Sequence, residues 1–280
     1  MKKRLVFHWF VANKRNVGTF SNTNKRNLRD VERFEALHLN CLKHYSSVFD
    51  CATFILAYEP GVTIEDVCEL EKKIVACGFL NVRFIVVPNN DFYGECLEWK
   101  KIVLENEEHF DGLTFFYHTK GITHEFTNSM VDWTTVLYYF NLEFAKIACE
   151  AITNKGSKFV TSGIFLVAGP DDGNTHGYDV DYHYFYCGNA SWLNYERLKA
   201  YYDSVGKKLE DYKVENRWSS ESFYAHAIPL EYAHSVGATA TGHVDDYKDC
   251  NTHLLSTVGK EAIKGYSDFK YNVALKGITL

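Results

Sequence analysis

The stretch Gly112-Leu-Thr-Phe-Phe-Tyr-His-Thr-Lys-Gly121 is the last strand in the alternating pattern from which the fold is predicted. Its apolar run, Leu113 to Tyr117, predicts a buried strand, and the polar residues His118, Thr119 and Lys120 follow at its carboxyl end. Open α/β sheets place their ligand crevice at such ends. An imidazole, a hydroxyl and an ammonium together favour an anion such as a diphosphate, although an ordinary polar turn would give the same pattern.

Strand and helix patterns alternate along the first 120 residues. Apolar runs predict strands over 4–11, 52–58, 82–87 and 113–117, and helical spacing predicts helices over 28–45, 63–77 and 95–107. Thr63 and Asp66 have the spacing of a capping box at the start of the second helix. The pattern predicts an α/β fold with a mostly parallel sheet flanked by helices, in which the loops 12–25 and 118–127 share one crevice.

The second half of the chain is less regular. It predicts one long helix over 130–151, strands over 158–167 and 182–192, and a short helix over 193–202. The spacing of the long helix places five apolar residues on or near one buried face: Trp133, Leu137, Phe140, Phe144 and Ile147. The Gly- and Asn-rich loop 169–177 is a candidate lid, and a plain surface excursion explains it equally well. Beyond residue 229 the periodicity fades, and the sequence assigns no elements there.

Charge and composition exclude several classes of protein. A formal net charge of −6 argues against a nucleic-acid binder, which needs a basic face. The basic clusters Lys2-Lys3-Arg4, Lys14-Arg15 and Lys25-Arg26 could face a phosphate ligand or an anionic surface, so a peripheral membrane contact stays open beside solvated loops. No apolar run approaches the roughly 18 residues of a transmembrane helix.

The cysteines and the amino terminus predict a cytoplasmic protein. None of the eight cysteines forms a C-x-x-C pair, and several lie in apolar runs, as free thiols do in reducing compartments. The first residues do not have the pattern of a signal peptide.

Motifs for several kinds of chemistry are missing from the sequence. It has no G-x-S-x-G elbow, no G-x-G-x-x-G after the first strand and no P-loop. Asp179-Val-Asp181 forms a D-x-D close to Asp171-Asp172 and His183, and such carboxylates can bind Mg²⁺ or Mn²⁺ with substrate phosphates. Solvated loop acids are the competing interpretation of this pair.

Four short motifs in order carry a resemblance to a known family. The segment Tyr117-His-Thr-Lys-Gly121, then Asp132-Trp133 and Tyr138-Tyr-Phe140, resembles uncharacterised glycosyltransferase-like proteins of bacterial polysaccharide loci and large viruses. Their "HYSGNFWW" segment is matched by His183-Tyr-Phe-Tyr-Cys-Gly-Asn-Ala-Ser-Trp192, with one aromatic missing, and their acidic residue before an aromatic by Glu221-Ser-Phe223. Glu95 matches a glutamate that opens the third helix.

The resemblance implies a GT-A-like nucleotide-sugar transferase. It covers residues 4–226, so we expect a transferase domain over 1–226 and a C-terminal extension over 227–280 packed on the same domain. GT-A folds carry a D-x-D metal motif at the end of the fourth strand, where this chain has His118-Thr-Lys120. An ammonium and an imidazolium can neutralise a departing nucleoside diphosphate in place of a divalent cation. Mn²⁺ or Mg²⁺ on Asp179 and Asp181 is the rival hypothesis.

The resemblance also implies roles for individual residues. Glu221 is the candidate general base if the enzyme inverts, Lys120 and His118 are the leaving-group partners, and His226 is a weaker alternative base. The remaining positions are predicted to bind substrate: His8 and Asn13 for the base and ribose, Gly188, Asn189 and Trp192 for the acceptor, and Thr119, Gly121, Glu95 and Trp133 at the matching motifs. Capping or surface roles compete for several of these residues.

The sequence therefore predicts a cytoplasmic glycosyltransferase of surface polysaccharide biosynthesis, with a nucleotide-sugar donor and a saccharide acceptor as its partners. A non-catalytic nucleotide- or sugar-binding relative is the alternative, because it would also lack the D-x-D motif at strand four. A nucleotidyltransferase is less favoured, since the loop after strand one offers only Gly18.

Overall fold

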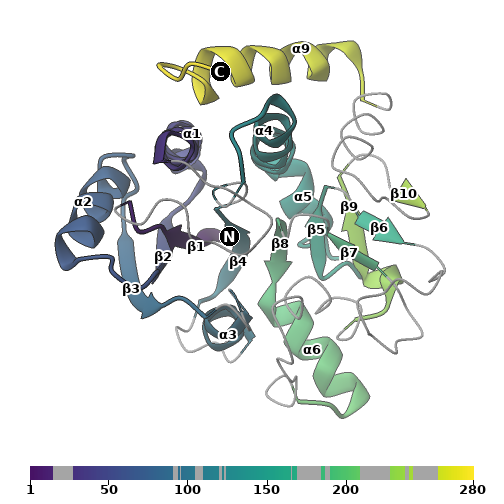
Figure 1. Cartoon of the computed structure of the whole chain (residues 1–280). Coiled ribbons are helices and arrows are strands. Elements are labelled where there is room, and N and C mark those ends of the chain that lie inside the picture. The colour runs from purple at the N-terminus through teal and green to yellow at the C-terminus, as the bar shows by residue number, and fades with distance from the viewer. Residues whose placement is uncertain are drawn as a thin grey trace.

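The structure is a computed structural model of the 280-residue chain. It describes residues 1–14, 28–90, 94, 96–104, 110–119, 122, 124–164, 166–168, 184–186, 190–208, 228–236, 240–241 and 258–280. A central sheet lies between two layers of helices, and a C-terminal helix forms a further layer outside one of them (Figure 1).

The amino-terminal half of the sheet is parallel. Its strands are β1 (Lys2–Val11), β2 (Cys51–Tyr58), β3 (Val82–Pro88) and β4 (Gly112–His118). They lie in the order β3-β2-β1-β4, so the chain order reverses between β1 and β4. The predicted α/β class and the mostly parallel sheet are confirmed.

The helices that connect these strands follow the predicted pattern. They are α1 (Leu28–Tyr45), a 3₁₀ turn η1 (Ser46–Val48), α2 (Ile64–Val75), and α3 (Cys96–Trp99), which continues as a π-helical turn, η2 (Lys100–Leu104). The capping box of α2 is confirmed, because Thr63 N donates to Asp66 Oδ2 at 2.9 Å and Asp66 N donates to Thr63 Oγ1 at 3.4 Å.

The carboxyl-terminal half of the described sheet adds β8 (Ser191–Asn194), β5 (Thr161–Gly163) and β9 (Ala233–Ser235). Among the strands described, β8 runs antiparallel to both of its neighbours, β4 and β5. A smaller sheet contains β10 (Ala240–Thr241), β6 (Leu166–Ala168) and β7 (Tyr184–Tyr186).

Two predicted strands are wrong in the same way. The apolar run 158–167 is divided between β5 and β6, and the run 182–192 between β7 and β8. Each run has one part in the main sheet and one part in the small sheet. An apolar run indicates burial, but it does not show where a chain passes from one sheet to the next.

The long helix predicted over 130–151 is also wrong. The chain forms α4 (Asn128–Leu142), capped by Thr127, and then α5 (Ala145–Ala151). Because the helix is interrupted at Glu143 and Phe144, Ile147 does not lie on the predicted buried face and is 51% exposed. The next helix, α6 (Tyr195–Val205), begins after its cap Asn194, which belongs to β8.

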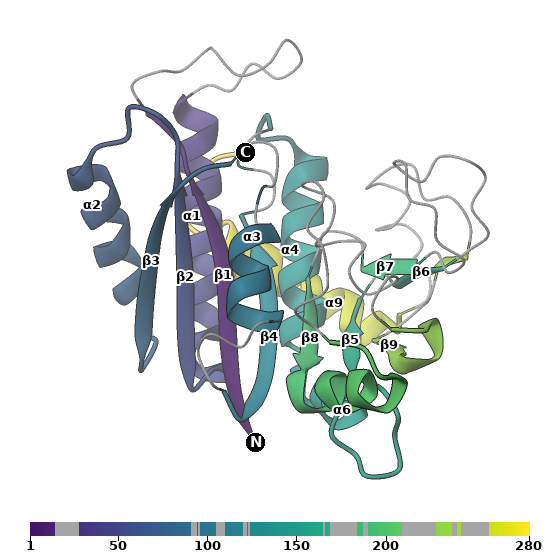
Figure 2. The ribbon, with the colours of Figure 1, turned by 90° about the horizontal axis from the view of Figure 1, so that it is seen from below.

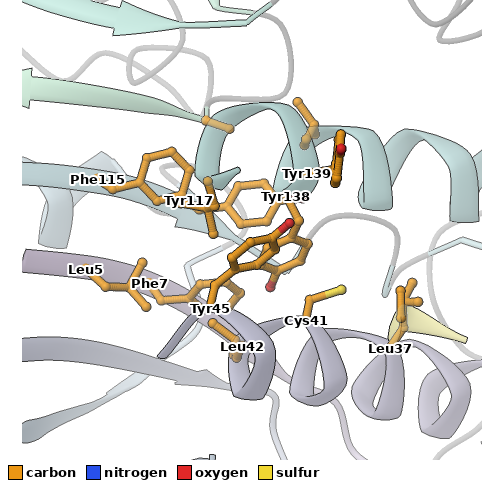
Figure 3. Packing of buried hydrophobic residues seen from close by; sticks show 14 of the residues in the cluster. Leu5, Phe7, Leu37, Cys41, Leu42, Tyr45, Phe115, Tyr117, Tyr138 and Tyr139 are labelled. Carbon is orange, nitrogen blue, oxygen red and sulfur yellow. The ribbon is translucent and has the colours of Figure 1, made fainter. Parts of the chain in front are cut away.

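Side chains on the two faces of the sheet form two hydrophobic clusters. The first cluster packs under α1, α2 and α4, and the second packs under α3, η2 and α6. Figure 2 shows these two sets of helices on opposite sides of the sheet. Along β1 the faces alternate: Phe7 and Trp9 point into the first cluster and Val6 into the second. Figure 3 shows aromatic side chains filling the first cluster between the sheet, α1 and α4.

The C-terminal residues contain elements that the sequence did not assign. They are η4 (Leu230–Tyr232), β9, β10, α9 (Lys260–Phe269) and the π-helical turn η5 (Lys270–Ala274). Residues on both sides of the predicted boundary at 226 and 227 share the main sheet, since β9 pairs with β5. The boundary itself stays a prediction. No helix in the described ranges is long and apolar enough to cross a bilayer.

Candidate functional site

The carboxyl ends of β1 and β4 lie side by side, with His8 opposite His118 in the pairing register. Thr119 joins the two ends. Its backbone N–H donates to the His8 carbonyl at 3.0 Å, and its hydroxyl accepts from the Phe10 N–H at 2.9 Å. The two loops that follow these strands therefore start from neighbouring points, as predicted for a shared crevice.

The two histidines point to the same side of the sheet. In-register neighbours on parallel strands share a face, and Val6 and Phe116, two residues earlier on each strand, both belong to the second cluster. His8 is 5% exposed, whereas His118 is partly exposed at the strand end. His118 is therefore the more accessible of the two imidazoles.

A buried carboxylate, Glu59, holds the end of β2 next to β1. Its Oε2 accepts from the Asn13 N–H at 2.7 Å, and its own N–H donates to the Val11 carbonyl at 3.1 Å. The Asn13 side-chain amide donates to the Pro60 carbonyl at 2.9 Å. Glu59 is 4% exposed and was not predicted as a site residue. Its only signal in the sequence is an acid placed directly after an apolar strand.

Gly61 is required at this turn for two reasons. Its φ of +87° lies in the left-handed region that favours glycine. A Cβ atom there would also collide with the Asn13 side-chain amide. The backbone after β2 can thus come close to Asn13, which the sequence predicted to bind the base and ribose.

A pocket lies beside the end of β1, between α1 and α2. Its empty volume is about 430 Å³, part of it open to solvent. Apolar side chains and charged side chains both line it: Trp9, Phe10, Val11, Ala12, Val31, Leu70 and Ile122, with Lys14, Glu35, Asp66, Glu69 and Lys73. Five of these twelve residues are charged, so the pocket is more polar than a typical small-molecule site.

The charged side of this pocket is an ion network centred on Glu35. Its carboxylate lies 3.0 Å from Lys14 Nζ and 2.8 Å from Lys73 Nζ, and Lys73 also pairs with Glu69 at 2.7 Å. Burial acts to lower the pKa of Lys73, but the hydrogen bonds and charges of Glu35 and Glu69 outweigh it and raise the pKa. Lys73 therefore stays an ammonium at the pocket.

Two predicted substrate-binding residues lie in the core instead. Trp133 and Trp192 are both 0% exposed. The Trp192 indole stacks on Phe49 with 5.7 Å between ring centroids and donates from Nε1 to the Asn141 carbonyl at 3.1 Å. Trp133 lies on α4 and belongs to the first cluster. Both indoles contact protein on all sides in this structure, because their motifs coincide with elements that pack the core.

Several predicted site residues lie outside the described residues. They are Lys120, Gly121, Glu95, Gly188, Asn189, Glu221, His226 and the candidate metal ligands Asp179 and Asp181. Their roles stay predictions. Within the part of the chain that is described, no three His, Cys, Asp or Glu side chains are grouped to hold a metal ion.

Comparisons with known proteins give a fold likeness and no family. No protein-family model matches the chain, and no curated protein matches it. Among solved structures 30 chains match. One is an active-site mutant of LgtC, with 11% identity over 92% of this chain and 85% of that chain and a TM-score of 0.42. The strand order and the pairing of the sheet define the fold of this chain.

Proposed function

We propose that this chain is a GT-A-like glycosyltransferase that moves a sugar from a nucleotide-diphosphate sugar to a saccharide acceptor. The observation that carries the proposal is the position of His118 and Thr119 between β1 and β4, where the strand order reverses. In open α/β sheets, ligands bind outside the carboxyl ends of the strands at this point.

The groups at this position favour an anionic ligand. A hydroxyl has one donor and two acceptor positions, so Thr119 can accept from the Phe10 N–H and donate to an anion at the same time. His118 adds an imidazole at the same strand end, and Lys120 follows in the sequence. Positive groups aimed at a departing diphosphate lower the barrier to its release.

We place the nucleoside of the donor beside Asn13, in the pocket at the end of β1. Phe10 lines this pocket and is only partly buried, which supports contact with a base, and the Lys14–Glu35 pair supplies polar groups there. Asn13 is held by Glu59 and Pro60, so its position is fixed before a ligand arrives.

The remaining assignments rest on the resemblance of the sequence motifs. We propose Glu221 as general base, Gly188 and Asn189 on the acceptor side, and Lys120 as the residue that neutralises the leaving diphosphate. Asp179 and Asp181 with Mn²⁺ or Mg²⁺ are the rival for that last role. We also propose that the reaction serves surface polysaccharide synthesis and takes place in the cytoplasm.

A donor panel tests the proposal directly. The purified chain is incubated with UDP-, GDP- and CMP-sugars, with Mn²⁺ and with EDTA, and transfer, donor hydrolysis and nucleotide binding are measured. We expect binding and turnover with at least one nucleotide-diphosphate sugar. Binding without turnover would favour the non-catalytic relative, and no binding to any nucleotide would refute the proposal.

Variants at the strand-four end test the site itself. We expect His118→Ala and Lys120→Ala to lower turnover by roughly 10²-fold or more, as loss of a single transition-state donor does. Lys146→Ala, on the exposed side of α5, is the matched control and should leave turnover unchanged. An unchanged rate in Lys120→Ala would remove Lys120 from the site, and loss of activity with EDTA would favour the aspartate pair.

A further inference from the structure

We propose that Asp132, Tyr266 and Lys270 are positioning residues through which the C-terminal helix fixes the first turns of α4 and, with them, the segment 124–127 that leads into α4. The effect on ligand binding rests on the proposed function above. The effect on the segment itself does not.

Polar contacts join the C-terminal helix to α4 at one carboxylate. Asp132 Oδ1 accepts from Lys270 Nζ at 2.6 Å and from Tyr266 Oη at 2.8 Å, and Tyr266 Oη lies 3.0 Å from Thr135 Oγ1. Lys270 is 7% exposed. A buried ammonium is costly unless it is paired, so Lys270 holds Asp132 in one place.

The phenol of Tyr266 stays a hydrogen-bond donor in this arrangement. Burial, and then the charge of Asp132, raise the pKa of Tyr266 far above its usual range. The hydroxyl is therefore protonated at any pH at which the protein is folded, and its bond to Asp132 does not depend on pH near neutrality.

Apolar packing brings the two helices close together around this cluster. The Tyr139 ring contacts both Tyr266 and Phe269, with 5.8 Å and 5.6 Å between ring centroids. A Cβ atom on Gly265 would overlap the Tyr139 hydroxyl, so α9 can approach α4 this closely only with glycine there. Figures 1 and 2 show α9 crossing the outer side of α4.

The first turns of α4 lead back to the candidate site. Thr127 caps the helix by accepting from the Met130 N–H at 3.4 Å, and Asp132 lies just after this first turn. Phe126, immediately before the cap, packs on Phe34 with 4.8 Å between ring centroids. Ile122 is buried in the same cluster and also lines the pocket at the end of β1. A shift of α4 would therefore move groups that face the ligand.

A positioning role and a simple packing role predict different results when the Asp132 cluster is removed. If the cluster positions the segment before α4, its loss should loosen residues 124–131 more than other parts of the protein. A general loss of stability would instead loosen all elements in proportion. Asn40 offers the control, because its amide donates to the Ala274 and Lys276 carbonyls at 3.0 Å each and holds the C-terminal segment on α1 without touching the Asp132 cluster.

The experiment compares Lys270→Met, Tyr266→Phe, Lys270→Arg and Asn40→Ala with the wild-type full chain. Hydrogen exchange of unliganded protein is followed at the amides of residues 124–131, and thermal unfolding is recorded for each variant. We expect Lys270→Met and Tyr266→Phe to speed exchange there by about tenfold or more, Lys270→Arg to restore much of the protection, and Asn40→Ala to leave it unchanged.

Binding of UDP and GDP forms the second measurement. If the ligand-competent fraction falls to about one tenth, the apparent Kd rises about tenfold, and we expect this for Lys270→Met but not for Asn40→Ala. Equal exchange in Lys270→Met and wild type, or equal loosening in Asn40→Ala, would overturn the proposal. A third outcome is that Lys270→Met exchanges faster than wild type while the wild type binds neither UDP nor GDP. That outcome would uphold the positioning role and refute the proposed function.

Discussion

Glu59 shows how one buried carboxylate can order the chain at the ends of β1 and β2. Its Oε2 is the acceptor for the Asn13 N–H at 2.7 Å in a site that is 4% exposed. We expect Glu59→Ala to lower the free energy of unfolding by about 1–3 kcal/mol, because it leaves a buried donor without its acceptor. Glu59→Gln keeps an acceptor oxygen and should lose less, as urea unfolding would show. Equal losses would mean that the hydrogen bond is not the cause.

His234 predicts how stability depends on pH. Burial lowers the pKa of His234, whose Nδ1 lies 2.8 Å from Ser162 Oγ. In the unfolded chain its pKa returns to about 6.5, so the unfolded state binds more protons below that pH. This contribution to stability is therefore present above about pH 6.5 and is lost as the pH falls towards the folded pKa.

Urea unfolding between pH 5 and pH 8 measures this effect. We expect the wild type to lose stability faster than His234→Asn as the pH falls below 6.5, and the difference between the two curves isolates the imidazole. Parallel curves for wild type and His234→Asn would show that this histidine does not contribute.

At the residue scale, the sequence predicted positions better than contacts. His118 and Thr119 could be found because polar residues after a buried strand must reach the sheet edge. Trp133 and Trp192 were assigned to substrate because their motif matched a family, but a motif does not state burial, and both are core residues. Glu59 was missed because an acid before Pro60 has the composition of an ordinary turn.

At the scale of elements, continuous apolar runs with clear boundaries gave the right strands. β1, β2 and β4 are buried over most of their length, β3 is only partly buried, and polar or proline residues follow or end β2, β3 and β4, so the apolar runs were enough. The strands β5 to β8 are three or four residues long, and their division between two sheets depends on contacts far apart in the sequence. Local pattern cannot supply such contacts.

Asn194 makes a prediction at the junction of β8 and α6. Its Oδ1 accepts from the Arg197 N–H at 3.1 Å as helix cap, and its Nδ2 donates to the buried Ile152 carbonyl at 2.8 Å. Asn194→Ala removes a cap worth about 1 kcal/mol and a buried hydrogen bond worth about 1–3 kcal/mol. Asn194→Ser keeps a capping oxygen and should lose only the second part in urea unfolding. Identical losses in both variants would contradict this division.

At the scale of the whole molecule, the composition of α4 explains why the C-terminal helix is needed as a further layer outside it. A helix that is hydrophobic on all sides must be buried on all sides. The residues of α4 from Trp133 to Leu142 are buried, on one side by the sheet and on the other by α9 and η5. The sequence contained this signal in the all-round apolar composition of 130–142, but it was interpreted as a single buried face.

The C-terminal helix should therefore be part of the cooperative unit rather than an appendage. Tyr266, Phe269 and Leu275 are each buried in the first cluster. Burial of three such side chains contributes about 1.5–3 kcal/mol each, which together approaches the whole free energy of unfolding of an ordinary domain, about 5–15 kcal/mol.

We expect a chain that ends at residue 257 to lose cooperative thermal unfolding and to bind a hydrophobic dye. A chain that ends at residue 276 keeps these contacts and the Asn40 bonds, and it should unfold like the full chain. A cooperative transition at the wild-type temperature in the shorter chain would show that the outer face of α4 is stable without its cover.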